Sequence, residues 1–295
     1  MGNHVFTGSG VAIATPMNAD FSVNYAKLGE LIDWQIENGT DAIVICGTTG
    51  EASTMTDSEH IECIRYAVER TAHRVPVVAG VGSNDTAYAI WLSQGAKRVG
   101  ADALLHVSPY YNKTSQRGLV AHFTACADAT DLPVILYNVP SRTGMDIKPE
   151  TYLELSKHPN IVGTKEAGGN IAAVAKTASL CGEDFAIYSG NDNEIIPIMS
   201  LGGKGVISVL ANICPRETHD MTKLYLDGKT TEAAKLQLEY ISLVDAIFCD
   251  VNPIPVKEAL NLMGKNAGPV RMPLVGLSDA HKALLRGELA AKGLI

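Results

Sequence analysis

Short, continuously apolar segments rich in valine and isoleucine recur along the chain, and longer amphipathic segments separate them. Each apolar segment is too short for a stable helix and too evenly apolar for a strand with one exposed face. A buried parallel strand therefore fits each of them best. Eight such strands are predicted, at residues 11–16, 42–47, 76–82, 101–109, 132–140, 161–167, 185–192 and 205–212.

Helical patterns lie between the predicted strands. Residues 24–38 place their apolar side chains on one face, and Gly39 follows as a typical residue after a helix end. Thr56 and Glu59 have the spacing of a capping box, which indicates the start of the next helix. Side-chain N-caps for two further helices are expected at Asn84 and Asn170.

One joint occurs twice and indicates repeated β/α units. Residues 39–44 and 100–105 both begin with glycine, carry an aspartate two positions later and continue into an apolar strand. Eight strands with helices between them predict an α/β fold, a closed (β/α)₈ TIM barrel. An open doubly wound sheet is the alternative, but no G-x-G-x-x-G loop follows the first strand.

The strand signal stops at about residue 215, and the remaining segments have helical patterns. We therefore predict a barrel over residues 1–214 and a helical extension packed on it over residues 215–295. The helices expected in the extension cover residues 217–226, 231–248, a segment after Pro253, and 279–289.

Composition narrows the classes of function. The formal net charge is −8 without a dense basic cluster, which argues against nucleic-acid binding. The six cysteines are scattered with no C-x-x-C pair, so free thiols are expected rather than a zinc site or disulfides. The first residues, MGNHVFTGSG, do not resemble a signal peptide or a myristoylation motif, and no apolar run is long enough to span a membrane. We expect a cytoplasmic protein without a membrane or nucleic-acid partner.

Catalytic residues of such barrels lie at the carboxyl ends of the strands. The predicted strand ends carry an apolar-flanked lysine, several tyrosines, two adjacent threonines and an arginine, but no cluster of His, Asp and Glu suited to a metal. Burial lowers the pKa of a lysine and frees its neutral amine to attack a ketone, so this combination favours imine chemistry. The residues concerned are Thr48, Thr49, Tyr110, Tyr111, Tyr137, Arg142 and Lys165.

Each of these side chains alone also has an ordinary structural interpretation. Lys165 at a strand end could only carry a charge into solvent, and Tyr137 alone is more often a core aromatic than an acid. A threonine in a turn is commonly a cap, and Arg142 alone is most often a surface residue. The catalytic interpretation is favoured because all of them fall on one rim of the predicted barrel.

The segments GTTGEAST, SPYYNKTS, YNVPSRTG, VGTKEA, YSGND, GVISVLAN and NPIPVKEAL resemble those of the dihydrodipicolinate synthase family, in register from about residue 7 to about residue 275. The resemblance implies a (β/α)₈ barrel with C-terminal helices and a homotetramer built as a dimer of dimers. It implies a Schiff-base-forming lyase that condenses pyruvate with L-aspartate 4-semialdehyde to 4-hydroxy-tetrahydrodipicolinate. The reaction belongs to lysine and diaminopimelate biosynthesis and needs no cofactor and no metal.

The resemblance also implies roles for individual residues. Lys165 would form the imine with pyruvate, and Tyr137 would be the proton relay. Thr48 would link Tyr137 to Tyr111, which the family usually supplies across a dimer interface. The residues expected to bind the substrates are Thr49 for the pyruvate carboxylate, Arg142 for the semialdehyde carboxylate, and Gly190 with the carbonyl of Ile207 as pocket lining.

Three other functions stay open at this point. N-acetylneuraminate lyase and the 2-keto-3-deoxy sugar acid aldolases share the lysine and the tyrosine, but Arg142 and the paired threonines favour the synthase. A non-enzymatic barrel that binds a small carboxylate is disfavoured by the complete set of catalytic residues. A metal-dependent aldolase or hydrolase lacks obvious ligands at the strand ends.

Part of the family is inhibited by lysine at a site near the dimer interface. His60, Asn84 and Tyr110 match the inhibitable pattern. Asp57 stands where a histidine is common, and Tyr88 stands where a glutamate would hold the amino group of the inhibitor. Because that carboxylate is missing, we predict weak or absent inhibition by lysine.

Overall fold

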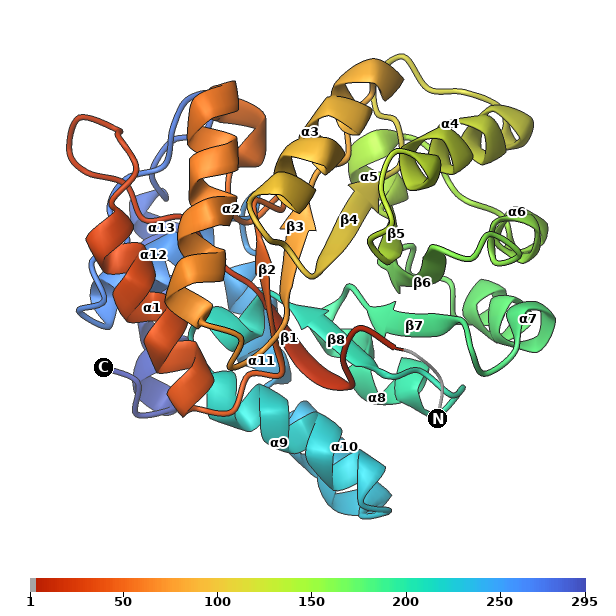
Figure 1. Cartoon of the computed structure of the whole chain (residues 1–295). Coiled ribbons are helices and arrows are strands. Elements are labelled where there is room, and N and C mark those ends of the chain that lie inside the picture. Colours follow the sequence, from red (N-terminus) through yellow and green to blue (C-terminus); the bar gives the residue numbers. More distant parts are fainter. Residues whose placement is uncertain (1–3) are drawn as a thin grey trace.

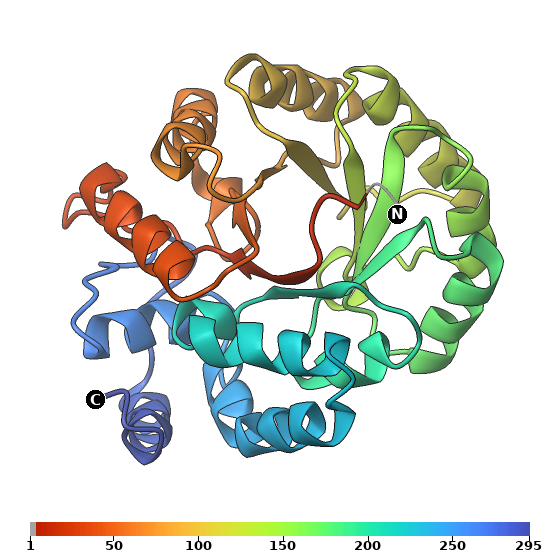
Figure 2. The ribbon, with the colours of Figure 1, turned by 60° about the horizontal axis from the view of Figure 1, so that its bottom comes forward.

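A computed structural model describes residues 4–295. Residues 1–3, which belong to the predicted barrel segment and to the segment compared with signal peptides, lie outside the described residues. Eight parallel strands pair in chain order, and β1 closes the ring on β8 (Figures 1 and 2). The predicted (β/α)₈ barrel is confirmed. The strands are β1 Gly8–Ala12, β2 Ala42–Ile45, β3 Val77–Gly80, β4 Ala103–Val107, β5 Val134–Asn138, β6 Ile161–Glu166, β7 Ala186–Ser189 and β8 Gly205–Ser208.

The first strand begins earlier than residues 11–16, where it was predicted. Gly8, Ser9 and Gly10 pair with β8 although they are small or polar, so no apolar pattern marks them. A side chain at position 10 would collide with Phe6, which packs against the strand there. Close packing, rather than apolar character, therefore decides where this strand starts.

The repeated glycine joint has the same structure at both places. Gly39 and Gly100 each have a φ of 90°, a conformation that a residue with a side chain rarely adopts. The Asp41 carboxylate accepts a hydrogen bond from the Ser9 backbone N–H at 2.8 Å, and Asp102 accepts one from Val77 at 2.8 Å. Each aspartate thus fixes the start of the preceding strand to the strand that follows it.

Helices surround the strands, as Figure 2 shows along the ring. The wall helices are α1 Tyr25–Glu37, α2 Asp57–Thr71, α3 Thr86–Arg98, α4 Gln116–Asp128, α5 Pro140–Thr143, α6 Pro149–Leu155, α7 Ile171–Cys181, α8 Ile195–Met199 and α9 Pro215–Leu226, with 3₁₀ turns η1 Ala52–Thr54, η2 Asp192–Glu194 and η3 Leu210–Asn212. The capping box of Thr56 with Glu59 and the N-cap at Asn170 are confirmed. The expected N-cap at Asn84 is wrong, because the next residue, Asp85, accepts the hydrogen bond from the first turn of α3.

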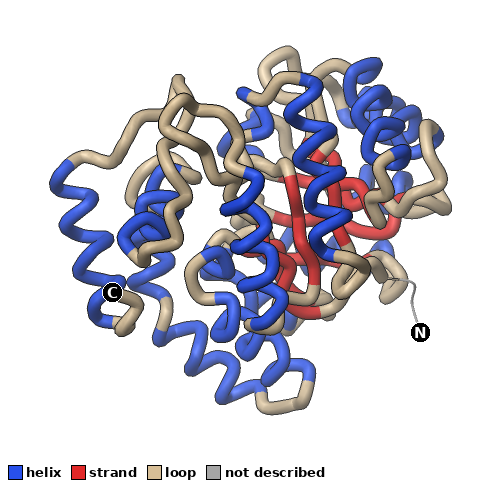
Figure 3. The backbone as a smooth tube through the Cα atoms, turned by 60° about the vertical axis from the view of Figure 1, so that its left-hand side comes forward, coloured by secondary structure: helices blue, strands red, loops and turns tan. Residues whose placement is uncertain are grey.

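The extension comprises α10 Thr230–Glu239, α11 Ile241–Ile247, α12 Ile254–Leu262 and α13 Asp279–Ala291. The single helix predicted over residues 231–248 is two helices that meet at Tyr240, since α10 packs on α9 and α8 whereas α11 packs on α12 and α13. Helix α9 packs against β1 and β8 and so occupies the eighth position of the barrel wall, although the predicted boundary after residue 214 places it in the extension. The boundary itself stays a prediction. Figure 3 shows the extension lying to one side of the strands.

The barrel interior is apolar at one end and polar at the other. The amino end is closed by Phe6, whose ring stacks on Tyr188 with centroids 4.4 Å apart and whose carbonyl accepts a hydrogen bond from the Tyr188 hydroxyl at 2.7 Å. The opposite end carries Lys165 and Tyr137 on neighbouring strands. Within residues 4–295, no helix combines the length and the apolar character that a membrane crossing requires.

Candidate active site

Lys165 lies on the inner face of β6 and is buried, with 6% of its surface exposed. Its Nζ atom is 4.4 Å from the centre of the Tyr137 ring on the neighbouring strand β5. Burial lowers the pKa of Lys165 to about 8, the charge of Asp192 opposes this shift, and Arg142 adds to it. About one tenth of this amine is therefore neutral and nucleophilic at pH 7, far more than at the ordinary lysine pKa.

Glu166 follows Lys165 on the strand and faces the outside of the barrel, as the alternation along a strand predicts. Its carboxylate accepts hydrogen bonds from Asn138 Nδ2 at 2.9 Å and from the Tyr152 hydroxyl at 3.0 Å. Burial raises the pKa of Glu166 to about 7. The glutamate is thus held behind the strand, where it forms no ion pair with Lys165.

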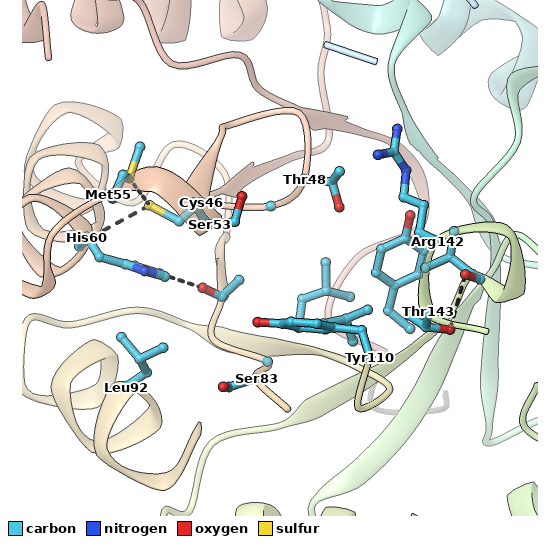
Figure 4. Close-up of a pocket in the computed structure, with 18 of the residues that line it drawn as sticks. Cys46, Thr48, Ser53, Met55, His60, Ser83, Leu92, Tyr110, Arg142 and Thr143 are labelled. Atoms are coloured by element: carbon cyan, nitrogen blue, oxygen red, sulfur yellow. Dashed lines mark hydrogen bonds between the residues drawn. The ribbon is translucent and has the colours of Figure 1, made fainter. Parts of the chain in front are cut away.

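Tyr137 and Arg142 come from the end of β5 and from the short helix α5 that follows it. Burial raises the pKa of the Tyr137 hydroxyl, while the charge of Arg142 and a hydrogen bond with Thr48 lower it. Figure 4 shows Thr48 and Arg142 among the residues that line one pocket. The tyrosine hydroxyl therefore has a side-chain partner suited to passing a proton.

A cavity of ≈ 200 Å³ lies between the strand ends and the extension. Six of the eight predicted site residues line it, namely Thr48, Thr49, Tyr137, Arg142, Lys165 and Gly190. Ile207 does not line it, because its side chain packs inside the barrel against the cluster that contains Tyr137. Tyr111 is also apart from the others: its side chain is 90% exposed, and its φ is 67°.

Gly190 makes room for the lysine. A Cβ atom at this position would stand 3.1 Å from Lys165 Cε and 2.8 Å from the Ala167 Cβ. Both contacts are closer than side-chain carbons normally pack, so any larger residue would displace Lys165. The structure therefore assigns Gly190 a steric role in addition to lining the cavity.

Asp192 was not among the predicted residues. It is buried at the start of η2 and accepts hydrogen bonds from Ser208 Oγ at 2.5 Å, Val209 N at 3.0 Å and Leu210 N at 2.9 Å. These contacts hold the end of β8 in place, and the charge lies near Lys165. In the sequence, the only signal that Asp192 belongs to the site is its position at a strand end.

The extension holds the loop that carries Thr48 and Thr49. Lys257 of α12 donates to Glu51 Oε1 at 2.7 Å, and both side chains are almost fully buried. Glu51 Oε2 accepts a further hydrogen bond from the Arg271 backbone N–H at 2.8 Å. Glu51 has a φ of 58°, so these contacts fix a residue in a rarely populated backbone conformation.

A second cavity of ≈ 320 Å³ shares Thr48, Tyr137 and Arg142 with the first. Figure 4 shows that it extends from Thr48 and Arg142 toward Cys46 and His60. Tyr88 also lines it, and its hydroxyl donates to Asp57 Oδ1 at 2.7 Å. The two residues behind the prediction of weak lysine inhibition therefore bind each other, and that prediction stays untested.

Two further observations concern the chemistry of the described chain. Among residues 4–295, no group of three or more His, Cys, Asp or Glu side chains is placed to hold a metal ion. The six cysteines are free, and four of them, Cys46, Cys63, Cys126 and Cys214, are buried.

Comparisons with known proteins agree on one family. The model of the dihydrodipicolinate synthetase family matches residues 5–292. The 4-hydroxy-tetrahydrodipicolinate synthase of Thermoanaerobacter sp. (strain X514) is 58% identical over 99% of this chain and 98% of its own. The solved dihydrodipicolinate synthase of Acinetobacter baumannii complexed with pyruvate is 42% identical, with a TM-score of 0.96 over 98% of this chain and 99% of its own. The enzyme from Cyanidioschyzon merolae with lysine bound is 40% identical, with a TM-score of 0.97 over 99% and 100%.

Proposed function

Because the chain belongs to the dihydrodipicolinate synthetase family, we propose that Lys165 is the nucleophile that forms an imine with pyruvate. The observation that carries this proposal is the buried amine on the inner face of β6, next to Tyr137 and with its pKa lowered to about 8. At the ordinary lysine pKa, almost every amine would be protonated at neutral pH and would have no free electron pair for the attack.

The overall reaction is the condensation of pyruvate with L-aspartate 4-semialdehyde to 4-hydroxy-tetrahydrodipicolinate, in lysine and diaminopimelate biosynthesis. The chain is a lyase of this family. The assignment of this reaction to individual side chains is our proposal, and the geometry of the cavity supports it as follows.

The neutral amine of Lys165 attacks the ketone carbon of pyruvate, and the resulting carbinolamine loses water to give an imine. Loss of a proton from the pyruvate methyl group turns the imine into an enamine. The enamine carbon attacks the aldehyde carbon of the second substrate, whose oxygen takes up a proton and becomes the hydroxyl group. The substrate amine then attacks the imine carbon, closes the ring and releases Lys165. Tyr137, coupled to Thr48, is placed to carry the protons of these steps.

Two residues of the cavity suit the carboxylates of the substrates. The Arg142 guanidinium matches the planar geometry of the semialdehyde carboxylate. The Thr49 hydroxyl accepts a hydrogen bond from Asn252 Nδ2 at 3.0 Å, which leaves its own proton free to donate to the pyruvate carboxylate. Gly190 shapes the wall beside the lysine, and the carbonyl of Ile207 stays a predicted contact of pyruvate.

The exposed Tyr111 supports the proposal of a homotetramer built as a dimer of dimers. A tyrosine that is 90% exposed in one subunit contributes nothing to that subunit's own cavity. In the proposed dimer it enters the site of the neighbouring subunit and extends the relay beyond Thr48. Sedimentation velocity measures the assembly, and Tyr111→Phe tests whether the hydroxyl is needed. A cytoplasmic location is part of the same proposal.

The first test is to trap the imine. The protein is incubated with pyruvate, reduced with borohydride, digested and examined by mass spectrometry. We expect a pyruvate-derived mass on Lys165, and no adduct in Lys165→Arg. A folded protein without an adduct on any lysine would overturn the mechanism and favour the non-enzymatic barrel. Rates with L-aspartate 4-semialdehyde and with sugar aldehydes separate the synthase from the sugar acid aldolases.

A further inference from the structure

We propose that Asn252 selects the second substrate by binding its α-amino group. This inference rests on the proposed function, because it concerns how the same cavity recognises L-aspartate 4-semialdehyde. Asn252 opens the NPIPVKEAL segment. It lies between α11 and α12, in the part of the extension that covers the strand ends.

The position of Asn252 is fixed from two sides. Its Nδ2 donates to Thr49 Oγ1 at 3.0 Å, and its backbone carbonyl accepts a hydrogen bond from Arg142 Nη2 at 3.0 Å. The residue is 6% exposed and lines the same cavity as Lys165. Its side chain is thus anchored between the two residues proposed to hold the carboxylates.

The other end of the amide has no partner. Of the buried side-chain polar atoms that have no hydrogen-bond partner within residues 4–295, Asn252 Oδ1 is the one that belongs to a residue lining this cavity. A buried carbonyl oxygen without a donor is unfavourable, so native structures retain such atoms where a ligand or water satisfies them. Because Nδ2 is engaged by Thr49, the acceptor end is the one left for a ligand.

The chemistry of the semialdehyde fits this arrangement. Its carboxylate and its ammonium group are attached to the same carbon atom, so a carboxylate held by Arg142 leaves the ammonium group close by. An ammonium group offers only donors, and Asn252 Oδ1 is an acceptor that needs one. Hydrogen bonds from charged donors are among the strong ones. The pair Arg142 and Asn252 therefore recognises an α-amino acid end rather than any carboxylate.

The test compares two ligands that differ only in the amino group. L-aspartate 4-semialdehyde is the substrate, and succinate semialdehyde, which has the same aldehyde and carboxylate but no amine, is the competing inhibitor. Three variants are measured: Asn252→Ala, the similarly sized Asn252→Leu, and Asn252→Asp, which keeps an acceptor. Asn193→Ala, an exposed asparagine on the same rim whose side chain forms no hydrogen bond in the structure, is the matched control.

For Asn252→Ala and Asn252→Leu, we expect the KM for aspartate semialdehyde to rise by about tenfold to hundredfold, the loss typical of a hydrogen bond to a charged group. The inhibition constant of succinate semialdehyde and the borohydride-trapped adduct stay at the values of the unmodified protein. Asn252→Asp keeps a low KM for the amino substrate. The Asn193→Ala control changes none of these values.

Two results would overturn the inference. An equal loss for both ligands means that Asn252 only supports Arg142 or Thr49, and an unchanged KM means that the amino group is bound elsewhere. Circular dichroism shows which variants fold, and the Leu and Asp substitutions keep the comparison available if the alanine variant does not. The trapped adduct separates this inference from the proposed function, because an adduct on Lys165 with no ligand discrimination refutes only the role of Asn252.

Discussion

Replacing Lys257 by methionine tests how strongly the extension holds the catalytic loop. The methionine fills a similar volume but cannot donate to Glu51 Oε1, now 2.7 Å from the lysine, or to the Pro269 carbonyl. Removing one partner of a buried ion pair typically costs about 3–5 kcal/mol, because the other charge stays buried. Glu51 keeps the hydrogen bond from Arg271 N, so we expect a loss near the lower end, about 3 kcal/mol.

Urea unfolding followed by circular dichroism measures this loss, at one protein concentration so that any assembly contributes equally. Lys282→Met is the matched control, because Lys282 is itself exposed in its pair with the half-buried Glu258 and its loss should change the free energy of unfolding by less than about 1 kcal/mol. The double variant Lys257→Met/Glu51→Gln removes both charges and should recover at least about 1 kcal/mol of the single loss.

Unfolding of Lys257→Met at the same urea concentration as the unmodified protein would contradict this expectation. A double variant no more stable than the single one would also contradict it, because the loss would then come from packing and not from a stranded charge. Kinetics give an independent readout. A loosened loop should raise the KM for pyruvate through Thr49, whereas Lys282→Met should leave it unchanged.

Three further predictions concern titration and regulation. With its pKa at about 8, Lys165 is about one tenth neutral at pH 7 and half neutral at pH 8, so the rate of adduct formation should rise about fivefold between them; a flat profile would contradict this. Burial lowers the pKa of His106 to about 3. Between pH 6.5 and 3 the unfolded chain therefore binds a proton on this histidine that the folded chain does not bind. The contribution of neutral His106 to the free energy of unfolding is fully present above pH 6.5 and falls as the pH drops. His106→Asn should reduce this dependence by up to about 1.4 kcal/mol per pH unit, and identical urea midpoints at pH 5 and 7 in both proteins would argue against it. L-lysine should inhibit weakly or not at all, since Tyr88 and Asp57 bind each other where the inhibitor's amino group needs a free carboxylate; low-micromolar inhibition would refute this.

The fold was predictable because strands buried on both faces leave continuous apolar segments, and each of the eight gave one strand. The errors arose where local chemistry was ambiguous. Ser9 and Gly10 belong to a strand without being apolar, and Asp85 rather than Asn84 caps a helix in a run of polar residues that all suit the position. The break at Tyr240 depends on what each half-helix packs against, which no local pattern reveals.

The site also contains residues that could be grouped from the sequence and residues that could not. Residues at the strand ends share a rim by topology alone, so Lys165, Tyr137 and Thr48 could be grouped from their positions. Asn252 reaches Thr49 across 203 residues of sequence, and only the packed extension brings the two together. The contact proposed for Tyr111 involves a second subunit, so one chain alone cannot display it.

The contact between Glu51 and Lys257 also determines when, during synthesis of the chain, the catalytic loop can be anchored. The two residues are 206 positions apart, so a ribosome adding 5–20 residues per second reaches the lysine roughly ten to forty seconds after the glutamate. During that interval every strand of the barrel has been made, since β8 ends at Ser208, but the loop bearing Thr48 and Thr49 is not yet anchored. A nascent chain can thus acquire the shape of the barrel well before it can hold pyruvate, and activity reports that synthesis has passed α12.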